Sequence, residues 1–213
     1  TVNPAIDRIV SVDRLVFEDR GYILSTDFAG GGRGINAARV LTSFGASTLA
    51  ITTSGKEGGR RLEEKLAHDA FATEFVKIRN NIRTNLTISD RQGLSVKLNE
   101  QGPSLSSGEL IRIRKAVERH LPEASWLMLC GSLPPGVPAD FYGRLIHVAE
   151  KQGVQTILDT DGDHRGHGRE AGPTGGTPNQ SEAERLLSRA LITRSHNVES
   201  SQEVKAMGPK VVV

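Results

Sequence analysis

The chain has 213 residues, of which 37% are hydrophobic, so it can bury a core in one large domain or in one domain with a small appendage. Its 27 basic and 25 acidic side chains leave a net charge of only +2, and aromatic residues make up only 4%, which argues against binding to nucleic acid or to a membrane surface. A single cysteine, Cys130, excludes an internal disulfide framework, and no apolar run approaches the roughly 20 residues that span a bilayer; we therefore expect a cytoplasmic protein.

The first half of the chain is predicted to combine short strands with helices. Residues 1–10 are predicted to form a strand with a loop at 3–7. Stretches of alternating apolar and polar residues follow, and these are typical of antiparallel strands. A glycine cluster then opens a helix that ends near Phe44, because Gly45 stops it. The other expected elements are strands at 9–16, 21–28 and 47–53, a helix at 61–69, and a hairpin of 84–89 and 94–98 around the turn 90–93.

From Ser106 onward, helices alternate with short apolar strands, which indicates a parallel sheet of an α/β protein. Residues 161–176 are expected to form a long loop with one helical turn. Two histidines in that loop, His164 and His167, are too few for a metal site and are interpreted as solvated. The expected helices are 109–120, 138–152, 181–189 and 200–207, and the expected strands are 126–130, 156–159 and 210–213.

The glycine cluster at 30–34 is the most informative segment. Glycine allows the backbone to lie close to a ligand, and the N–H groups of the following helix favour anions. The amide of Asn36, in the first helical turn, can donate to one hydroxyl and accept from another, so the segment suits a polyol or sugar phosphate. A simple tight turn is the alternative. A dinucleotide site lacks its later carboxylate, and a P-loop lacks its lysine.

Further candidates follow the strands of the predicted parallel sheet, where ligands of such folds bind. Ser132 comes directly after the strand 126–130 and can bring a hydroxyl to a substrate. Asn179 and Glu182 are spaced to share one face of a helix start. The alternative for this pair is a structural role, with Asn179 as N-cap and Glu182 as its capping-box partner.

Six ordered segments together resemble the ribokinase-like carbohydrate kinases of the phosphofructokinase B type, and most closely the branch of 1-phosphofructokinases and tagatose-6-phosphate kinases. The resemblance implies a Rossmann-type three-layer α/β sandwich over 1–213, with a mostly parallel sheet and a small β-sheet lid within about 9–28 and 84–98. Such lids often pair between subunits, so the resemblance allows a homodimer through the lid. The segments are 1–7, 30–41, 83–85, 99–103, 131–136 and 178–182.

The resemblance also implies roles for individual residues. Asp7 would accept hydrogen bonds from sugar hydroxyls, and Arg83 would contact the substrate phosphate, for which its planar fork is suited. Without the motifs, Asp7 would be interpreted as a turn residue and Arg83 as a solvated charge. The other implied sugar-site residues are Gly31, Gly32 and Asn36, whereas Asn179 and Glu182 would organise Mg²⁺, through water, near the phosphates of ATP.

The implied reaction transfers the γ-phosphoryl group of ATP to a hydroxyl of a sugar phosphate. The family's late Gly-Ala-Gly-Asp motif, with its general-base aspartate, does not occur before Val213. We therefore expect both ends of the chain to be cut, the base to lie beyond Val213, and the 213 residues alone to be inactive. Two alternatives stay open: a noncatalytic sugar-phosphate binding module, and a nucleoside or ribose kinase, although Arg83 favours a phosphorylated acceptor. The residues do not choose between fructose 1-phosphate, fructose 6-phosphate and tagatose 6-phosphate.

Overall fold

The structure, a computed structural model, describes residues 1–160, 168 and 170–212. They divide into two compact units, Thr1–Ile113 with Pro134–Gly136, and Arg114–Leu133 with Val137–Val213. Both units combine helices with strands, and five of the seven described strand pairings are parallel. The expected α/β class with mostly parallel strands is confirmed.

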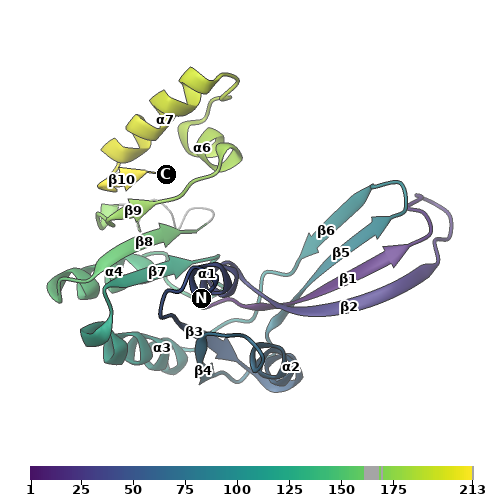
Figure 1. Cartoon of the computed structure of the whole chain (residues 1–213), viewed down its shortest axis with the longest axis horizontal. Helices are drawn as coiled ribbons and strands as arrows, with labels where there is room; N and C mark the ends of the chain where they lie inside the picture. Colours follow the sequence, from purple (N-terminus) through teal and green to yellow (C-terminus); the bar gives the residue numbers. More distant parts are fainter. Residues whose placement is uncertain (161–167, 169, 213) are drawn as a thin grey trace. The chain divides into compact units, whose positions relative to one another are not determined.

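A four-stranded sheet in the first unit is built from β1 (Ala5–Val12), β2 (Ile23–Gly31), β5 (Arg83–Asp90) and β6 (Ser95–Asn99), in the order β2-β1-β5-β6 (Figure 1). β1 runs antiparallel to β2 and parallel to β5, and β5 and β6 form the predicted hairpin. The predicted loop at 3–7 was wrong for its last three residues. β1 is continuous from Ala5, because its residues pair with β2 on one side and with β5 on the other.

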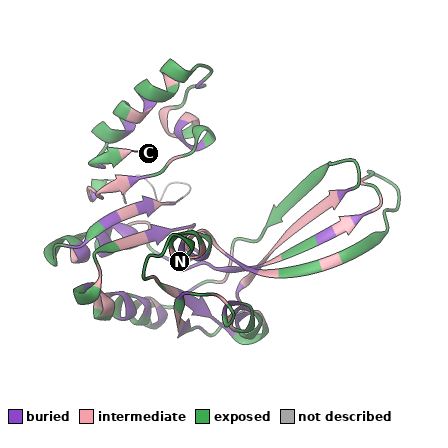
Figure 2. Cartoon of the chain, in the orientation of Figure 1, coloured by how far each residue is buried: buried purple, intermediate pink, exposed green. Residues whose placement is uncertain are grey.

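The outer strands of this sheet face solvent. Every residue of β6 is exposed, and most of β2 is exposed as well (Figure 2). At the far end of the sheet, the Asp90 carboxylate accepts hydrogen bonds from the backbone N–H groups of Leu15, Gln92 and Leu94. Burial raises the pKa of Asp90, but these bonds outweigh burial and the pKa lies below its usual value. The turn of the hairpin and the β1–β2 connection are thus fixed to one carboxylate.

The rest of the first unit places two helices beside a second, parallel sheet of two strands. Gly45, with φ 83°, follows the first helix where the sequence predicted its end. The second helix begins at Lys56 rather than 61, directly after the extended residue Gly55. The elements are α1 (Arg33–Ser43), β3 (Leu49–Ser54), α2 (Lys56–Leu66), β4 (Ala72–Lys77) and the start of α3 (Ser107–His120).

The second unit contains a parallel four-stranded sheet in the order β10-β9-β8-β7. β7 (Trp126–Cys130) matches its predicted range, and Cys130 is buried as expected. Gly175 and Gly176 were expected in a loop but form β9 (Gly175–Gly176), because β8 and β10 both pair with it. His164 and His167 lie outside the described residues. The other elements are η1 (Leu121–Glu123), α4 (Phe141–Lys151), β8 (Gln155–Asp159), α6 (Gln180–Leu187), α7 (Arg194–Ala206) and β10 (Val211–Val212).

Lys56 has a strained backbone at the start of α2. Its φ of 49° lies in the left-handed region, which costs a side-chain-bearing residue about 1–2 kcal/mol. Glycine has no such penalty but loses about 0.5–1 kcal/mol of chain entropy on folding. We expect Lys56→Gly to raise the free energy of unfolding by about 0.5–1 kcal/mol in urea denaturation. Lys56→Ala, which keeps the strain, is the matched control, and equal stability of the two variants would contradict the explanation.

Glu109 is a buried carboxylate that joins the start of α3 to the segment after β4. Its side chain, 5% exposed, accepts hydrogen bonds from Arg79 N and from Ser106 N and Oγ, at 2.6, 2.7 and 2.6 Å. Ser106 Oγ accepts from Glu109 N in return, as in a capping box. Burial raises the pKa of Glu109, but the bonds from Ser106 and Arg79 outweigh it, and the pKa lies below its ordinary value.

The lowered pKa of Glu109 predicts a pH-dependent loss of stability. The contribution of this carboxylate is complete above the unfolded-state pKa and is lost as the pH falls through the lower, folded-state pKa. We expect Glu109→Gln to destabilise the chain by about 1–2 kcal/mol at pH 7 and by progressively less as the pH falls below the ordinary glutamate pKa. Urea unfolding over a series of pH values measures this. The exposed Glu64→Gln is the control, and a pH-independent difference for Glu109→Gln would refute the assignment.

Candidate functional site

A carboxylate and an amide meet on one face of the sheet, where β1 and β5 begin. Asn85 Nδ2 donates to Asp7 Oδ1 at 2.9 Å, and the two residues are paired in the parallel register. Arg83 stands two residues before Asn85, and alternate residues of a strand share a face. The register thus places Asp7, Asn85 and Arg83 on the same face of the sheet. Asn85 Oδ1 is buried and has no hydrogen-bond partner within the described part of the chain.

Gly31, the last residue of β2, makes room for the Asp7 carboxylate. A Cβ on Gly31 would lie 2.6 Å from Asp7 Cγ, closer than real Cβ contacts. Gly31 pairs with Ala5, so its backbone cannot withdraw without opening the sheet. A side chain at this position would therefore have to displace the Asp7 carboxylate.

The chain turns from β2 into α1 at Gly32, which has a φ of 129° and is the N-cap of the helix. This positive φ explains the glycine that the sequence placed at the helix start. Asn36 lies exposed in the first turn, and its Oδ1 accepts a hydrogen bond from Arg39 Nη1 at 3.1 Å. The side chain was expected to donate and accept equally, but part of its acceptor capacity is already used.

Arg83 is held next to the segment that follows β6. Its Nη1 donates to the Glu100 carbonyl at 3.1 Å, and the neighbouring Thr84 N donates to Glu100 Oε2 at 2.9 Å. The same segment contacts the N-terminal motif, since Asn3 Nδ2 donates to the Gln101 carbonyl at 2.9 Å. The motifs at 1–7, 83–85 and 99–103 are thus joined by hydrogen bonds around the start of β1.

These groups match the chemistry of a polyhydroxylated anion. The Asp7 carboxylate is an acceptor for hydroxyl groups, the amides supply donors, and Arg83 supplies a positively charged fork. Gly31 and Gly32 let the backbone approach a ligand closely. The arrangement can bind a sugar through its hydroxyls and a phosphate through its charge.

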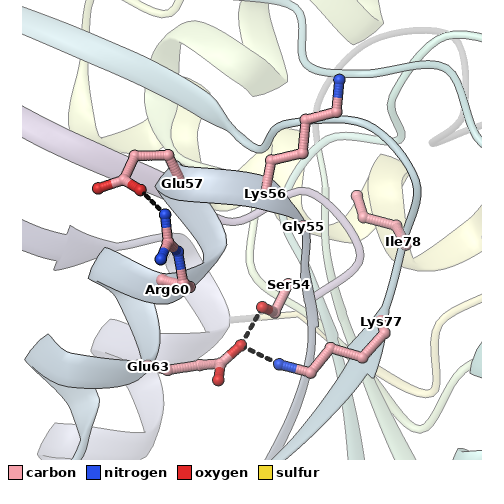
Figure 3. Close-up of a pocket in the computed structure, with 8 residues that line it drawn as sticks. All are labelled: Ser54, Gly55, Lys56, Glu57, Arg60, Glu63, Lys77 and Ile78. Carbon is pink, nitrogen blue, oxygen red and sulfur yellow. Dashed lines mark hydrogen bonds and ion pairs between the residues drawn. The ribbon is translucent and has the colours of Figure 1, made fainter.

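A cavity of about 460 Å³ lies elsewhere in the same unit, at the ends of β3 and β4 and the start of α2 (Figure 3). Four of its five charged side chains form ion pairs, because Glu63 bonds Lys77 as well as Ser54, and Glu57 bonds Arg60. Burial raises the pKa of Glu63, but these two bonds outweigh it and lower the pKa. No predicted site residue lines the cavity. The lining residues are Ser54, Gly55, Lys56, Glu57, Arg60, Glu63, Lys77 and Ile78.

Three predicted site residues belong to the second unit. Ser132 follows Gly131, whose φ is 84° and whose carbonyl accepts hydrogen bonds from Tyr142 and Thr160. Asn179 caps α6: its side chain accepts from Glu182 N at 2.9 Å, and its own N–H donates to Glu182 Oε2 at 3.0 Å. The capping-box alternative for this pair is confirmed.

The capping box does not fit direct ligation of a metal. Glu182 is 2% exposed, and one of its carboxylate oxygens accepts a hydrogen bond from Asn179 N. The pair therefore lacks the several accessible oxygen ligands that Mg²⁺ requires. Across residues 1–160, 168 and 170–212, no group of three or more His, Cys, Asp or Glu side chains could hold a metal ion. The indirect contact through water stays a prediction. Within the same ranges, none of the helices has the length and apolar character needed to cross a membrane.

Sequence reasoning missed two residues of the first unit. Asn85 was noticed only as part of a motif, although it fixes the Asp7 carboxylate. Arg39 was not considered, although it bonds Asn36. The spacing of three between Asn36 and Arg39 on one helix could have indicated that contact, whereas the pairing of Asp7 with Asn85 depends on the sheet register.

The chain is similar to known carbohydrate kinases. The family model described as pfkB family carbohydrate kinase matches residues 2–213. A tagatose-6-phosphate kinase of Staphylococcus epidermidis is 28% identical over 162 residues, which cover 76% of this chain and 52% of the relative. The chain thus spans about half the length of the curated relative. Escherichia coli phosphofructokinase-2 in complex with fructose-6-phosphate is 28% identical, with a TM-score of 0.87 over 98% of this chain and 69% of that one. A tetrameric inhibited form of the same enzyme gives a TM-score of 0.88, with the same identity and coverage.

Proposed function

Because the chain belongs to the pfkB family of carbohydrate kinases, we propose that its first unit binds the sugar phosphate in an ATP-dependent transfer of the γ-phosphoryl group to a ketohexose phosphate. The observation that carries the proposal is the shared sheet face of Asp7, Asn85 and Arg83, with Gly31 beside the carboxylate. A carboxylate for hydroxyls and a guanidinium for phosphate are the two groups that such a substrate needs.

Each residue has a defined task in this proposal. Asp7, oriented by Asn85, accepts hydrogen bonds from sugar hydroxyls, and Asn36 donates through its amide nitrogen. Arg83 binds the phosphate that the sugar already carries, so the remaining hydroxyl is held in one place toward ATP. Such positioning converts a two-body reaction into a step within one complex, which supplies a large share of phosphoryl-transfer catalysis.

The phosphoryl donor is ATP, which arrives as its magnesium complex. We place Ser132 near the sugar and Asn179 and Glu182 near the nucleotide phosphates, on the family motif alone. The residues assigned above bind and position the substrates, and none of them is assigned as a general base; loss of such a base costs about 10²–10⁴-fold in rate. Sugar-phosphate binding without turnover is the alternative reading of the same site.

The relatives' names suggest the substrate class and the assembly. They name tagatose 6-phosphate and fructose 6-phosphate, and we propose one of these or fructose 1-phosphate as the acceptor. We also propose that the sheet β2-β1-β5-β6 acts as a lid and pairs with a second copy in a homodimer, in the cytoplasm. Its exposed apolar side chains support the pairing; they include Ile23, Leu24, Val96 and Leu98.

Calorimetric titration of the purified 213-residue chain tests the binding half of the proposal. The ligands are the three ketohexose phosphates and, as the matched control, unphosphorylated fructose. We expect at least one phosphorylated sugar to bind about tenfold or more tightly than fructose. ADP release, measured in parallel with ATP and magnesium, separates a kinase from a binding module. Equal affinity for sugar and sugar phosphate, or binding to none of them, would refute the assignment of Arg83.

A further inference from the structure

Arg39 on α1 bonds three separate parts of the first unit at once. Its Nη1 donates to Asn36 Oδ1 at 3.1 Å and to the Gly30 carbonyl at 2.9 Å. Its Nε and Nη2 donate to both carboxylate oxygens of Asp69, at 3.0–3.2 Å. The side chains of Arg39 and Asp69 are 34% and 21% exposed, so this ion pair is partly shielded from water. Asp69 follows α2, and the guanidinium therefore joins α1, the end of β2 and the chain after α2.

The chemistry of the guanidinium decides how the Asn36 amide is turned. Arginine has donors and no acceptor, so Asn36 must present its oxygen to Arg39 and not its nitrogen. Asn36 Nδ2 has no hydrogen-bond partner in the part of the chain that the structure describes. The two N–H groups of the amide are thus left as donors for a ligand oxygen.

We infer that Arg39, itself fixed by Asp69, is a positioning residue that sets Asn36 as a hydrogen-bond donor to a sugar hydroxyl. The inference rests on the proposed function, because it assumes that Asn36 contacts the sugar. The second bond of Arg39 Nη1, to the Gly30 carbonyl, helps to hold the guanidinium itself in place beside Asn36. Without Arg39, the amide is free to rotate and to present its oxygen to a hydroxyl instead of its nitrogen.

A merely structural role for Arg39 predicts a different pattern of affinities. A residue that only stabilises the fold changes stability whether or not Asn36 is present. A residue that acts through Asn36 has no effect on sugar affinity once the Asn36 side chain is gone. A double-mutant cycle separates the two cases.

The cycle consists of Arg39→Met, Asn36→Ala and the double variant, titrated calorimetrically with the ketohexose phosphate that binds the wild-type chain best. We expect Kd to rise about tenfold for Arg39→Met and about 10–30-fold for Asn36→Ala, and the double variant to match Asn36→Ala. Asp69→Asn, which weakens the anchor of Arg39, should raise Kd by a smaller factor, about threefold. Arg144→Met is the matched control, because Arg144 also bonds an aspartate, Asp140, and both of these side chains are exposed at the start of α4; its Kd should equal that of the wild type.

The outcomes separate this inference from the proposed function. Binding of no sugar phosphate by the wild-type chain refutes the proposed function. Wild-type binding with an unchanged Kd for Arg39→Met, or with fully additive effects in the double variant, overturns the positioning role alone. If Arg39→Met does not fold, Arg39→Lys takes its place in the cycle. Lysine keeps the charge but cannot bond all three partners. We expect Arg39→Lys to raise Kd about fivefold when Asn36 is present and to leave Kd unchanged when it is combined with Asn36→Ala.

Discussion

Replacing Gly31 with alanine is expected to weaken sugar-phosphate binding about 100-fold while the chain stays folded. The added Cβ would lie 2.6 Å from Asp7 Cγ, and the pairing of Gly31 with Ala5 prevents the backbone from yielding. Asp7 must therefore turn away, and its bond to Asn85 breaks with it. Hydrogen bonds to a charged group contribute about 1.5–3 kcal/mol, and a loss of about 2.7 kcal/mol corresponds to 100-fold in Kd.

Titration of Gly31→Ala with the preferred sugar phosphate measures this loss. Gly108→Ala is the matched control, because a Cβ at Gly108 would meet nothing closer than Arg112 Nη1 at 3.9 Å, and its Kd should not change. Asp7→Asn should weaken binding to a similar degree. It removes the negative charge of the Asp7 side chain, whereas Gly31→Ala pushes the same side chain away from the sugar. Wild-type affinity in Gly31→Ala would show that the Asp7 carboxylate does not bind the sugar.

The sequence was most informative about fold where a signal is local. The apolar run Trp126–Cys130 became a strand with the same bounds, and Gly45 ended the first helix with a positive φ, because burial and chain stereochemistry act within a few residues. Elements that form only by pairing with strands distant in the sequence were predicted less well. Two glycines with little strand propensity form β9 because strands on both sides supply the hydrogen bonds, and no local pattern contains that information.

In the candidate site, too, the residues of a local motif could be predicted, whereas a contact between distant segments could not. Gly31, Gly32 and Asn36 could be named from the glycine cluster, and the structure gives each a reason for its identity or direction. The contact between Asp7 and Asn85 joins residues that are 78 positions apart, so only the pairing of β1 with β5 produces it. The sequence allowed two interpretations of Asn179 and Glu182, a ligand-binding pair and a capping box. The two hydrogen bonds between these residues form the capping box.

Loss of the Arg83 guanidinium is expected to abolish the preference for phosphorylated sugars. Arg83→Met should raise Kd for the preferred ketohexose phosphate about 100-fold and leave the weak affinity for fructose unchanged, because only the phosphate loses a charged, two-pronged partner. Arg83→Lys keeps a point charge without the planar fork, and about a tenfold loss is expected. Arg83 lies on the same sheet face as Asp7 and Asn85, but at the start of β5, two residues before Asn85. Its replacement therefore removes the contact with the phosphate and leaves the contacts of Asp7 with the sugar hydroxyls in place.

The control for Arg83 lies four residues earlier in the chain. Arg79 has an exposed side chain, and its backbone N–H bonds Glu109, so Arg79→Met removes a nearby positive charge without removing that contact. If general electrostatic attraction holds the phosphate, Arg79→Met and Arg83→Met will weaken binding similarly, and 0.5 M salt will remove most of both effects. If Arg83 binds the phosphate directly, only Arg83→Met will change the ratio of Kd values for fructose and its phosphate. The backbone N–H of Thr84 keeps its bond to Glu100 in every variant, so β5 retains its place beside β1 and a changed ratio reports the lost side chain.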